Sequence, residues 1–278
     1  MKIKKLSIIT INLNDSKGLE KTIKSVITQT FINYEFIIID GASTDKSIEI
    51  IKQYKDFITF WKSEPDTGIY NAMNKGIKVA QGEFCLFLNS GDVLFDNSSL
   101  EKSFSYMNED IKIASCRIKV NNKIIEPPTD DKKLRFTFGH QPCHQATFIH
   151  RSLFNKYGYY NEMNRIASDV EFFFIAMDIN GELMQQIPVV LAIFDTTGIS
   201  STAESQKNVF SEMKNMYARL FPEPYNYVLY EYSINLSYLG TKKIEMIKNI
   251  DKYFFLRRMT SFALYVPYFI SKILDRKN

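Results

Sequence analysis

Residues 36–45 read Phe-Ile-Ile-Ile-Asp-Gly-Ala-Ser-Thr-Asp, and this stretch decides the fold. An apolar run rich in β-branched residues is typical of a strand buried on both faces of a parallel sheet. The strand is expected to end at Asp40 and Gly41, and a helix is expected to begin between Ser43 and Asp45. A buried strand followed directly by a helix is the repeating unit of an α/β fold.

The same unit recurs along the first 110 residues. In these sheets ligands bind beyond the carboxyl ends of the strands, which is where Asn12, Asp40 and Asp92 fall. The alternation predicts a doubly wound, mainly parallel sheet with helices on both faces. The predicted strands are 6–12, 36–39, 58–61 and 83–88, and the predicted helices are 16–29, with Asp15 or Ser16 as N-cap, 43–54 and 69–80.

The alternation becomes irregular after residue 110. The helix from Ser168 to about Asn180 is expected to begin with a capping box, in which Ser168 caps the helix and Glu171 completes the motif. Pro222 and Pro224 mark the predicted end of a catalytic domain, 1–220, with a nucleotide-sugar half at about 1–110 and an acceptor half at about 111–220. The other predicted elements are a hairpin at 111–125, a loop at 129–145, strands at 146–150 and 183–194, and helices at 152–157 and 203–220.

Composition and charge exclude several classes of protein. The chain has 278 residues, of which 45% are hydrophobic, so it can bury a large core and is not a disordered chain. The three cysteines, Cys85, Cys116 and Cys143, are too few and too far apart for a disulfide framework. Residues 1–220 hold 26 basic and 26 acidic residues, whereas residues 221–278 hold 9 and 5, so the net charge of +4 belongs to the last segment. A neutral body argues against a nucleic-acid binder.

The basic, aromatic tail at 221–278 predicts an attachment segment of helices. Its longest uncharged stretch, 259–271, is interrupted by Pro267 and would span ~20 Å as a helix, against ~30 Å of hydrocarbon, so it can lie on a membrane but not cross it. Two interpretations stay open: an interfacial helix on an anionic membrane, or helices that pack on the body or form an oligomer contact. The apolar run 6–11 is too short for a signal peptide, and we expect a cytoplasmic protein, peripheral on the inner face of the cell membrane.

Polar residues near the predicted strand ends are candidates for chemistry, each with a structural alternative. Asp40 suits a hydrogen bond to a ribose or base, or the capping of the next helix. Asp66 and Asn74 suit the polar lining of a site, and Asp92 suits a divalent cation on a diphosphate, or an ordinary turn. Between them, a stripe of small residues at fourfold spacing is expected to pack against the sheet: Gly68, Ala72, Gly76 and Ala80.

Two further candidates lie in the second half. The spacing of His140, Cys143, His144 and His150 lacks the second half-site of a structural zinc centre, so binding of phosphate or acceptor hydroxyls by His144 and Gln145 is the alternative. Asp169 falls in the first turn of a helix, where it can complement the helix dipole or act as a general base.

Taken together, these segments resemble the family 2 glycosyltransferases over about residues 5–200. Each motif is weak alone, but they occur in the family's order. They are Ser-Ile-Ile-Thr-Ile-Asn at 7–12, Ser-Val-Ile-Thr-Gln-Thr-Phe at 25–31, the stretch 37–45, Gly-Ile-Tyr-Asn-Ala-Met-Asn-Lys-Gly-Ile at 68–77, Ala-Gln-Gly-Glu-Phe at 80–84, Leu-Asn-Ser-Gly-Asp at 88–92, His-Gln at 144–145 and Ser-Asp-Val-Glu-Phe-Phe at 168–173.

The resemblance implies a GT-A-like fold and an inverting transfer from a nucleotide diphosphate sugar, with a UDP-sugar favoured, to a saccharide acceptor. Together with the tail at 221–278, it implies an acceptor that is lipid-linked, as in surface polysaccharide assembly. It implies Asp169 as catalytic base and Asp92 as the ligand of Mn²⁺ or Mg²⁺. The residues implied to bind the donor are Thr10, Asn12, Asp40, Asp66, Asn74, Ser90 and Asp92.

One departure from the family concerns the metal site. Where the family carries two or three carboxylates, this chain has Asn89 and Gly91 and retains only Asp92. A degenerate protein that only binds glycan or nucleotide therefore stays open as an alternative function. A nucleotidyltransferase also stays open, because it could share the sheet architecture. A single carboxylate can still hold Mg²⁺ when diphosphate oxygens complete the shell, so metal affinity without donor should be weak.

Overall fold

The computed structural model describes residues 5–128, 141–196, 198 and 203–221. Most of the loop predicted at 129–145, including His140, and nearly all of the tail predicted at 221–278 lie outside these residues. Within the described part of the chain, no helix has the length and apolar character needed to cross a bilayer.

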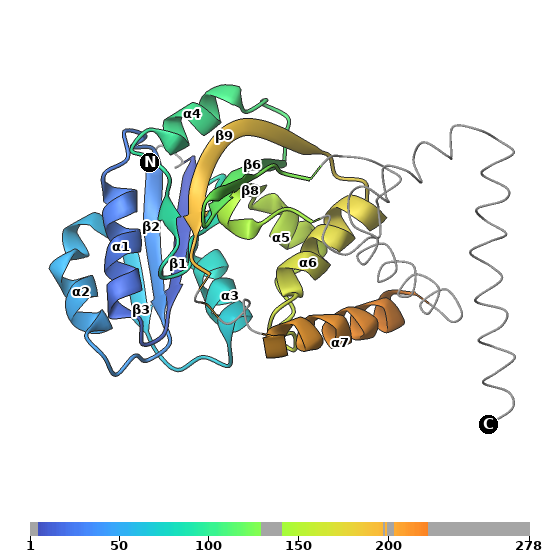
Figure 1. Ribbon diagram of the computed structural model, residues 1–278, viewed down its shortest axis with the longest axis horizontal. Coiled ribbons are helices and arrows are strands. Elements are labelled where there is room, and N and C mark those ends of the chain that lie inside the picture. Colours follow the sequence, from blue (N-terminus) through green and yellow to red (C-terminus); the bar gives the residue numbers. More distant parts are fainter. Residues whose placement is uncertain (1–4, 129–140, 197, 199–202, 222–278) are drawn as a thin grey trace, which may run out of the picture.

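A single sheet of nine strands forms the centre of the molecule (Figure 1). Its order is β3-β2-β1-β4-β8-β6-β9-β5, with β7 paired to β6. The first four strands are mutually parallel, as are β6 and β9, so the predicted mainly parallel α/β sheet is confirmed. The strands are β1 (Leu6–Asn12), β2 (Tyr34–Asp40), β3 (Phe60–Ser63), β4 (Phe84–Phe87), β5 (Val93–Leu94), β6 (Ile113–Val120), β7 (Lys123–Ile125), β8 (Thr147–His150) and β9 (Met184–Phe194).

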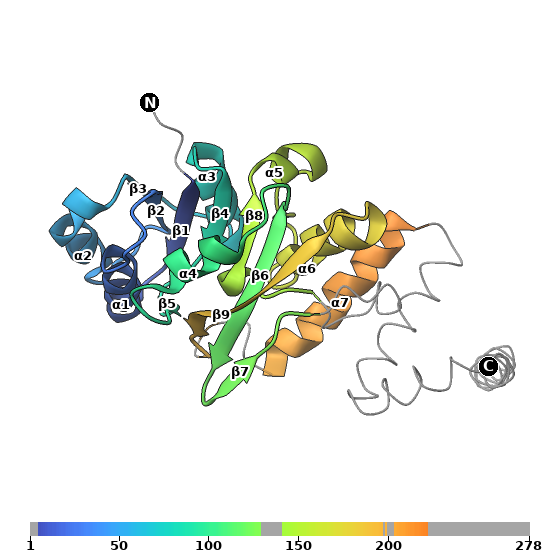
Figure 2. The ribbon, with the colours of Figure 1, turned by 90° about the horizontal axis from the view of Figure 1, so that it is seen from above.

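Helices cover both faces of the sheet, as the sequence predicts. Alternation along β1 sends Ile8 into the core shared with α1, α2 and α4, and Ile9 into the core shared with α3, α5 and α6. A further helix, α7, lies beside α6 in both views (Figures 1 and 2). The helices are α1 (Ser16–Ile27), α2 (Ser47–Gln53), α3 (Ile69–Val79), α4 (Ser99–Tyr106), α5 (Ser152–Tyr157), α6 (Ser168–Phe173) and α7 (Ala203–Leu220), with short 3-10 segments at Lys55–Phe57 and His144–Ala146.

Local signals in the sequence predict some helix ends correctly and others wrongly. The Asp15 side chain accepts a hydrogen bond from the Gly18 amide at 2.9 Å and caps α1, as predicted. The capping box at Ser168 and Glu171 is wrong, because α6 has no side-chain cap and Ser168 Oγ instead accepts from the Asn161 amide at 2.6 Å. The helix predicted to reach Asn180 continues from α6 as a π-helix, Phe174–Ile179.

Three of the four small residues in the predicted stripe pack as expected. Ala72 and Ala80 are buried, and a Cβ added at Gly76 would lie 2.5 Å from Ile9 Cγ2 on the sheet. Gly68 is different, since a Cβ there would meet nothing within 4 Å, but its φ of +139° is one that L side chains rarely adopt. Close packing therefore fixes α3 against β1, while Gly68 allows the chain to turn into the helix.

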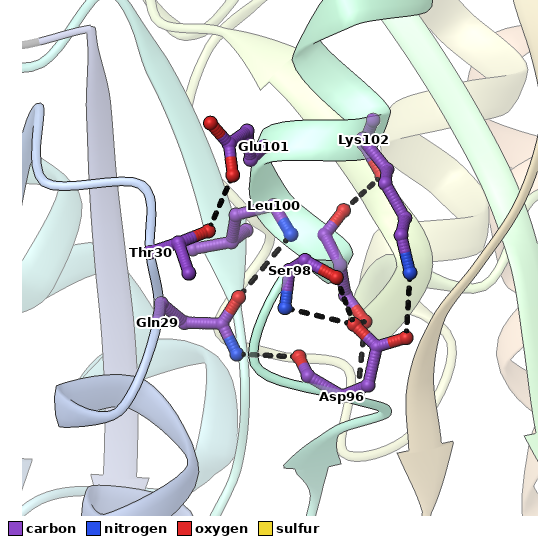
Figure 3. A network of polar contacts seen from close by, with 9 residues as sticks. Gln29, Thr30, Asp96, Ser98, Leu100, Glu101 and Lys102 are labelled. Carbon is purple, nitrogen blue, oxygen red and sulfur yellow. Dashed lines mark hydrogen bonds and ion pairs between the residues drawn. The ribbon is translucent and has the colours of Figure 1, made fainter.

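A polar network joins the end of α1 to the start of α4, an element that the sequence analysis does not predict (Figure 3). Gln29 donates to the Asp96 carbonyl at 2.7 Å and accepts from the Leu100 amide at 3.2 Å. Thr30 donates to Glu101 at 2.6 Å. These contacts give a structural role to Gln29 and Thr30, which belong to the motif at 25–31, and they support the turn between β5 and α4.

Candidate active site

Hydrogen bonds connect the carboxyl ends of four adjacent strands. Ser90, after β4, donates to Asn12 Oδ1 at 2.8 Å, and Asn12 Nδ2 donates to Asp40 Oδ1 at 2.7 Å. Ser63 at the end of β3 donates to Asp40 Oδ2 at 2.7 Å. The structure therefore brings Asn12, Asp40 and Ser90 together at one sheet edge, because parallel strands end on the same side.

The Asp40 carboxylate is fully buried and is held by its own chain. Besides Asn12 and Ser63, it accepts hydrogen bonds from the amide of Ser43 at 2.9 Å and from the Ser43 hydroxyl at 2.6 Å. A buried carboxylate needs such partners to remain charged. Asp40 thus shapes the turn after β2 but does not cap the next helix, because α2 begins only at Ser47 and has no side-chain cap. Its contact with a donor stays a prediction.

The other predicted donor residues differ in where they lie. Thr10 is fully buried in β1, and its hydroxyl has no hydrogen-bond partner. Asp66 lies against the turn after β2, since a Cβ at Gly41 would be 2.6 Å from Asp66 Oδ2.

Asn74 does not fit the donor-binding role. Its amide donates to the Tyr160 carbonyl and to Glu162, and its oxygen accepts from the Tyr160 amide at 3.0 Å. These contacts commit the buried side chain to holding the loop before α6, so we correct its assignment to a supporting residue.

Asp92 lies in the turn between β4 and β5. Its carboxylate accepts from the amides of Asn89 at 3.1 Å and Asp195 at 2.9 Å, and the Asp92 carbonyl accepts from Thr22 of α1 at 2.7 Å. Burial, only partly offset by the Asp195 amide and the charge of His144, raises the pKa of Asp92 to about 6. The carboxylate is thus costly to ionise here unless positive charge is close by.

A second carboxylate occupies the space beside Gly91. A Cβ at this position would lie 2.3 Å from Asp195 Oδ2, and Gly91 has a φ of +98°. Asp195 directly follows β9, which runs parallel to β6 and ends at the same edge. The carboxylate of Asp195 therefore lies where a side chain at position 91 would begin.

Asp169 is the centre of a chain of three side chains. Its Oδ1 lies 2.7 Å from the Tyr70 hydroxyl, and its Oδ2 lies 2.8 Å from His144 Nδ1. The side chains of His144 and Asp169 are only 13% and 14% exposed, and His144 Nε2 is buried without a partner. A side chain so oriented can present its second ring nitrogen to a ligand.

Electrostatics favour a charged pair of Asp169 and His144. Burial alone would raise the pKa of Asp169, but the hydrogen bond and charge of His144 and the hydrogen bond from Tyr70 outweigh it, so this pKa is lowered. Burial alone would lower the pKa of His144, yet Asp169 and the charge of Asp92 raise it. The carboxylate of Asp169 therefore ionises at lower pH than that of Asp92.

The remaining histidine that the structure describes lies elsewhere. His150 Nδ1 is 2.7 Å from Ser152 Oγ, and its Nε2 is 3.9 Å from Glu83, so it shares no partner with His144. The zinc interpretation is not supported in the described part of the chain, where no group of three or more His, Cys, Asp or Glu side chains is placed to hold a metal. Gln145 is buried beside His144 in the same 3-10 segment.

Comparison with known proteins agrees with this geometry. The sequence pattern described as Glycosyl transferase family 2 matches residues 7–174 of the chain. The chain belongs to glycosyl transferase family 2. An uncharacterized glycosyltransferase of Mycobacterium tuberculosis is 33% identical over 219 residues, which cover 76% of this chain and 82% of that protein.

Solved structures share the fold of this glycosyltransferase. S. aureus TarS in complex with UDP-GlcNAc has a TM-score of 0.65 at 18% identity and covers 83% of this chain and 72% of its own. The mannosyltransferase PcManGT from Pyrobaculum calidifontis, in complex with GDP-Man and Mn²⁺, has a TM-score of 0.62 at 14% identity and covers 99% and 88%. The expected GT-A-like fold is confirmed.

Three residues around the site of this glycosyltransferase were missed in the sequence: Tyr70, Asp195 and Glu212. Asp195 had a usable signal, because a carboxylate directly after a predicted strand is the pattern that singled out Asp40. Tyr70 lies within the motif at 68–77 but was not singled out there, and Glu212 had no signal. Their contacts with loop 161–167 span 96 and 45 to 47 residues of sequence.

The charged pair predicts a measurable change at His144. In Asp169→Asn, the pKa of His144 should fall, because burial then acts without the opposing carboxylate. Proton NMR titration of the histidine ring signals measures this, with the His144 signal assigned from its absence in His144→Gln. His150 is the internal control, because its ring contacts Ser152 and Glu83 instead. An unchanged His144 pKa in Asp169→Asn would contradict the pairing.

Proposed function

We propose that this glycosyltransferase moves a sugar from a UDP-sugar to a saccharide acceptor by a single displacement that inverts the anomeric configuration. One observation carries the proposal: Asp169 is held by Tyr70 and His144, which lower its pKa despite burial, while Asp92, whose charge acts on the same His144, has a raised pKa. Two carboxylates whose environments push their pKa values apart are suited to different roles in one reaction.

Asp169 is the proposed general base. Two of its lone pairs are used by Tyr70 and His144, and a carboxylate has about four, so an acceptor hydroxyl can still bind. As the acceptor oxygen forms its bond to the anomeric carbon, its proton passes to Asp169. The bond between the anomeric carbon and the diphosphate oxygen breaks, and nucleoside diphosphate leaves with that electron pair.

His144 is proposed to act on the leaving group or the acceptor. Its Nδ1 is engaged by Asp169, so the second proton of the imidazolium resides on the unpartnered Nε2. A charge-assisted hydrogen bond from Nε2 to a phosphate oxygen would stabilise the charge that develops there. The adjacent Gln145 is retained in the proposed contact with phosphate or acceptor hydroxyls.

The residues present fit a divalent cation held jointly with the donor. The turn offers the carboxylate of Asp92, the Asp195 carboxylate against Gly91, and Asn89 Oδ1, which is buried without a partner. Oxygen ligands of this kind suit Mg²⁺ or Mn²⁺, which often use only one or two protein carboxylates with substrate phosphates. When bound, the cation would neutralise charge on the diphosphate.

The donor side of the proposal rests on the polar edge and on the relatives. Asn12, Asp40 and Ser90 lie at the strand ends where nucleotides bind in open α/β sheets, with Asp66 beside them. The neighbouring structures carry UDP-GlcNAc in one case and GDP-Man with Mn²⁺ in the other. We favour UDP over GDP and choose UDP-GlcNAc as the first donor to test.

Donor and metal binding should be interdependent. With Mn²⁺ present, UDP and UDP-GlcNAc should raise the melting temperature more than GDP and GDP-Man, since a ligand at 100 times its Kd stabilises by ~2.7 kcal/mol. Mn²⁺ alone should bind weakly, which isothermal calorimetry measures. Tight Mn²⁺ binding without nucleotide would contradict the joint binding of metal and donor. Stabilisation by GDP but not by UDP would contradict the preference for UDP.

Substitutions at the two carboxylates test the reaction itself. UDP release from UDP-GlcNAc, to water or to a supplied saccharide, should fall by ~100-fold or more in Asp169→Asn, because the base is lost. Asp92→Asn should raise the Mn²⁺ concentration needed for half-maximal rate. Asp195→Asn should also raise this concentration, but by less. Glu49→Gln, an exposed change on α2, is the control. Wild-type turnover in both Asp169→Asn and Asp92→Asn would overturn the catalytic assignment of these carboxylates. No turnover by the wild-type chain would favour a degenerate binding protein, and release of pyrophosphate instead of UDP would favour a nucleotidyltransferase.

The acceptor is proposed to be a saccharide linked to a membrane lipid, because the excess of basic over acidic residues at 221–278, 9 against 5, suits an anionic surface. The full chain should float with vesicles of anionic phospholipid, and truncation after residue 220 should abolish flotation. Neutral phosphatidylcholine vesicles are the control. If neither form binds anionic vesicles, the membrane association is wrong and the alternative of an oligomer contact gains support.

A further inference from the structure

The last helix that the structure describes is attached to the loop that carries the proposed base. Helix α7 lies outside residues 7–174, which match the family pattern, yet it runs beside α6 (Figure 2). Met213, Met216 and Tyr217 of α7 are buried against Phe174, whose ring centroid is 5.4 Å from that of Tyr217. This apolar contact fixes α7 on the molecule, and the polar residues of α7 make further contacts.

Glu212 of α7 binds three consecutive backbone amides. Its carboxylate accepts from the amides of Arg165 at 2.7 Å, Ile166 at 3.1 Å and Ala167 at 2.8 Å. Successive amides that converge on one anion form a nest, and hydrogen bonds to a charged group are stronger than neutral ones. Glu212 therefore fixes, from 45 residues away, the backbone that leads into α6.

The segment that carries these three amides contacts Tyr70, the first of the hydrogen-bonded side chains Tyr70, Asp169 and His144. The Ile166 carbonyl lies 2.6 Å from the Tyr70 hydroxyl, which is 2.7 Å from Asp169 Oδ1. Ala167 immediately precedes the first turn of α6, in which Asp169 is the second residue. A displacement of this backbone would thus move Asp169 and its hydrogen-bond donor together.

A second ion pair from α7 holds the other side of the same loop. Arg219 pairs with Glu171, which also accepts from Asn164 at 2.8 Å and Asn161 at 3.3 Å. Helix α7 therefore holds loop 161–167 at both ends. Glu212 binds the amides at its end, and Arg219 binds Glu171, which accepts from Asn161 and Asn164 nearer its start. Glu212 differs from Arg219 in touching the segment that contacts Tyr70.

We propose that Glu212 is a positioning residue, which orients Asp169 and Tyr70 by fixing the backbone of residues 165–167. The inference rests on the proposed role of Asp169 as base. It assigns a function in the reaction to a helix beyond the region that matches the family.

The pH profile gives a readout that a purely structural role would not change. The titratable groups that act on Asp169 or feel its charge come from several elements: Tyr70 of α3, Cys143 and His144 of the loop and 3-10 segment before β8, and Tyr160 before α6. Of these, His144 and Tyr70 hold its pKa down against burial. When the backbone under Tyr70 loosens, the acidic limb of the kcat profile should therefore move to higher pH.

The experiment compares Glu212→Gln with wild type in UDP release from UDP-GlcNAc at saturating Mn²⁺. Glutamine keeps the size but offers one acceptor oxygen and an NH₂ group that opposes the third amide. We expect kcat to fall by ~10- to 100-fold, as small misplacements of catalytic groups do, with little change in donor KM. Glu49→Gln serves as the matched control on an exposed helical surface.

The outcomes separate this inference from the function on which it rests. If Asp169→Asn is inactive while Glu212→Gln keeps the wild-type kcat and acidic limb, the positioning role is wrong and the proposed base stands. If Asp169→Asn is fully active, the proposed function fails first. If Glu212→Gln does not fold, Glu212→Asp, which retains the charge but shortens the reach, gives the same readouts, and a wild-type kcat and pH profile there would also overturn the inference.

Discussion

The hydrogen bond between Asn12 and Asp40 is the interaction on which the arrangement of this edge depends. Asp40 is fully buried, and a buried charge without partners is strongly unfavourable. The chain satisfies it by drawing in Asn12 from β1, Ser63 from β3 and the Ser43 turn. The requirement to give one buried carboxylate its hydrogen-bond donors thus aligns the ends of three strands, and Ser90 extends the alignment to β4 through Asn12.

This requirement explains why polar groups can gather in a sheet that is otherwise apolar. Below Asn12, β1 contributes Ile8 and Ile9 to opposite cores, so the strand is held by burial on both faces. At the end of the same strand, the side chain of Asn12 makes hydrogen bonds instead of apolar contacts. The edge is therefore both the limit of the core and the place where a ligand can find directional partners.

Local pattern predicts most of the fold but only part of the site. Strand β2 and helix α1 follow from hydrophobic period and a capping residue, which act over a few residues. The error at α6 has a physical reason: Ser168 and Glu171 match a capping box in spacing, but Asn161 and Arg219 compete for the same side chains. Contacts over such separations leave no trace in a local pattern, and the same is true of Tyr70.

The opposite pKa shifts of Asp92 and Asp169 follow from what surrounds each group rather than from burial, which they share. Asp169 has a cation, His144, as a direct partner and a hydroxyl on its other oxygen. Asp92 has two backbone amides and a neighbouring carboxylate, so burial dominates. Because folding lowers the pKa of Asp169, this group stabilises the folded state at pH values above the pKa of an unfolded aspartate, and the stabilisation is lost as pH falls. Because folding raises the pKa of His144, its stabilisation is present at low pH and is lost as pH rises.

Two positions where the chain departs from expectation have a common explanation in the close approach of distant segments. Gly91 replaces a carboxylate of the family's motif, and the space that a side chain would fill holds Asp195 from the end of β9. The backbone that leads into α6 has no side-chain cap at Ala167, and Glu212 from α7 binds its amides. In both cases the carboxylate comes from a residue that lies more than 40 positions later. It follows that the functional unit extends beyond residue 174, where the family pattern ends, to at least Glu212, and that the match alone understates how much of the chain holds the site in place.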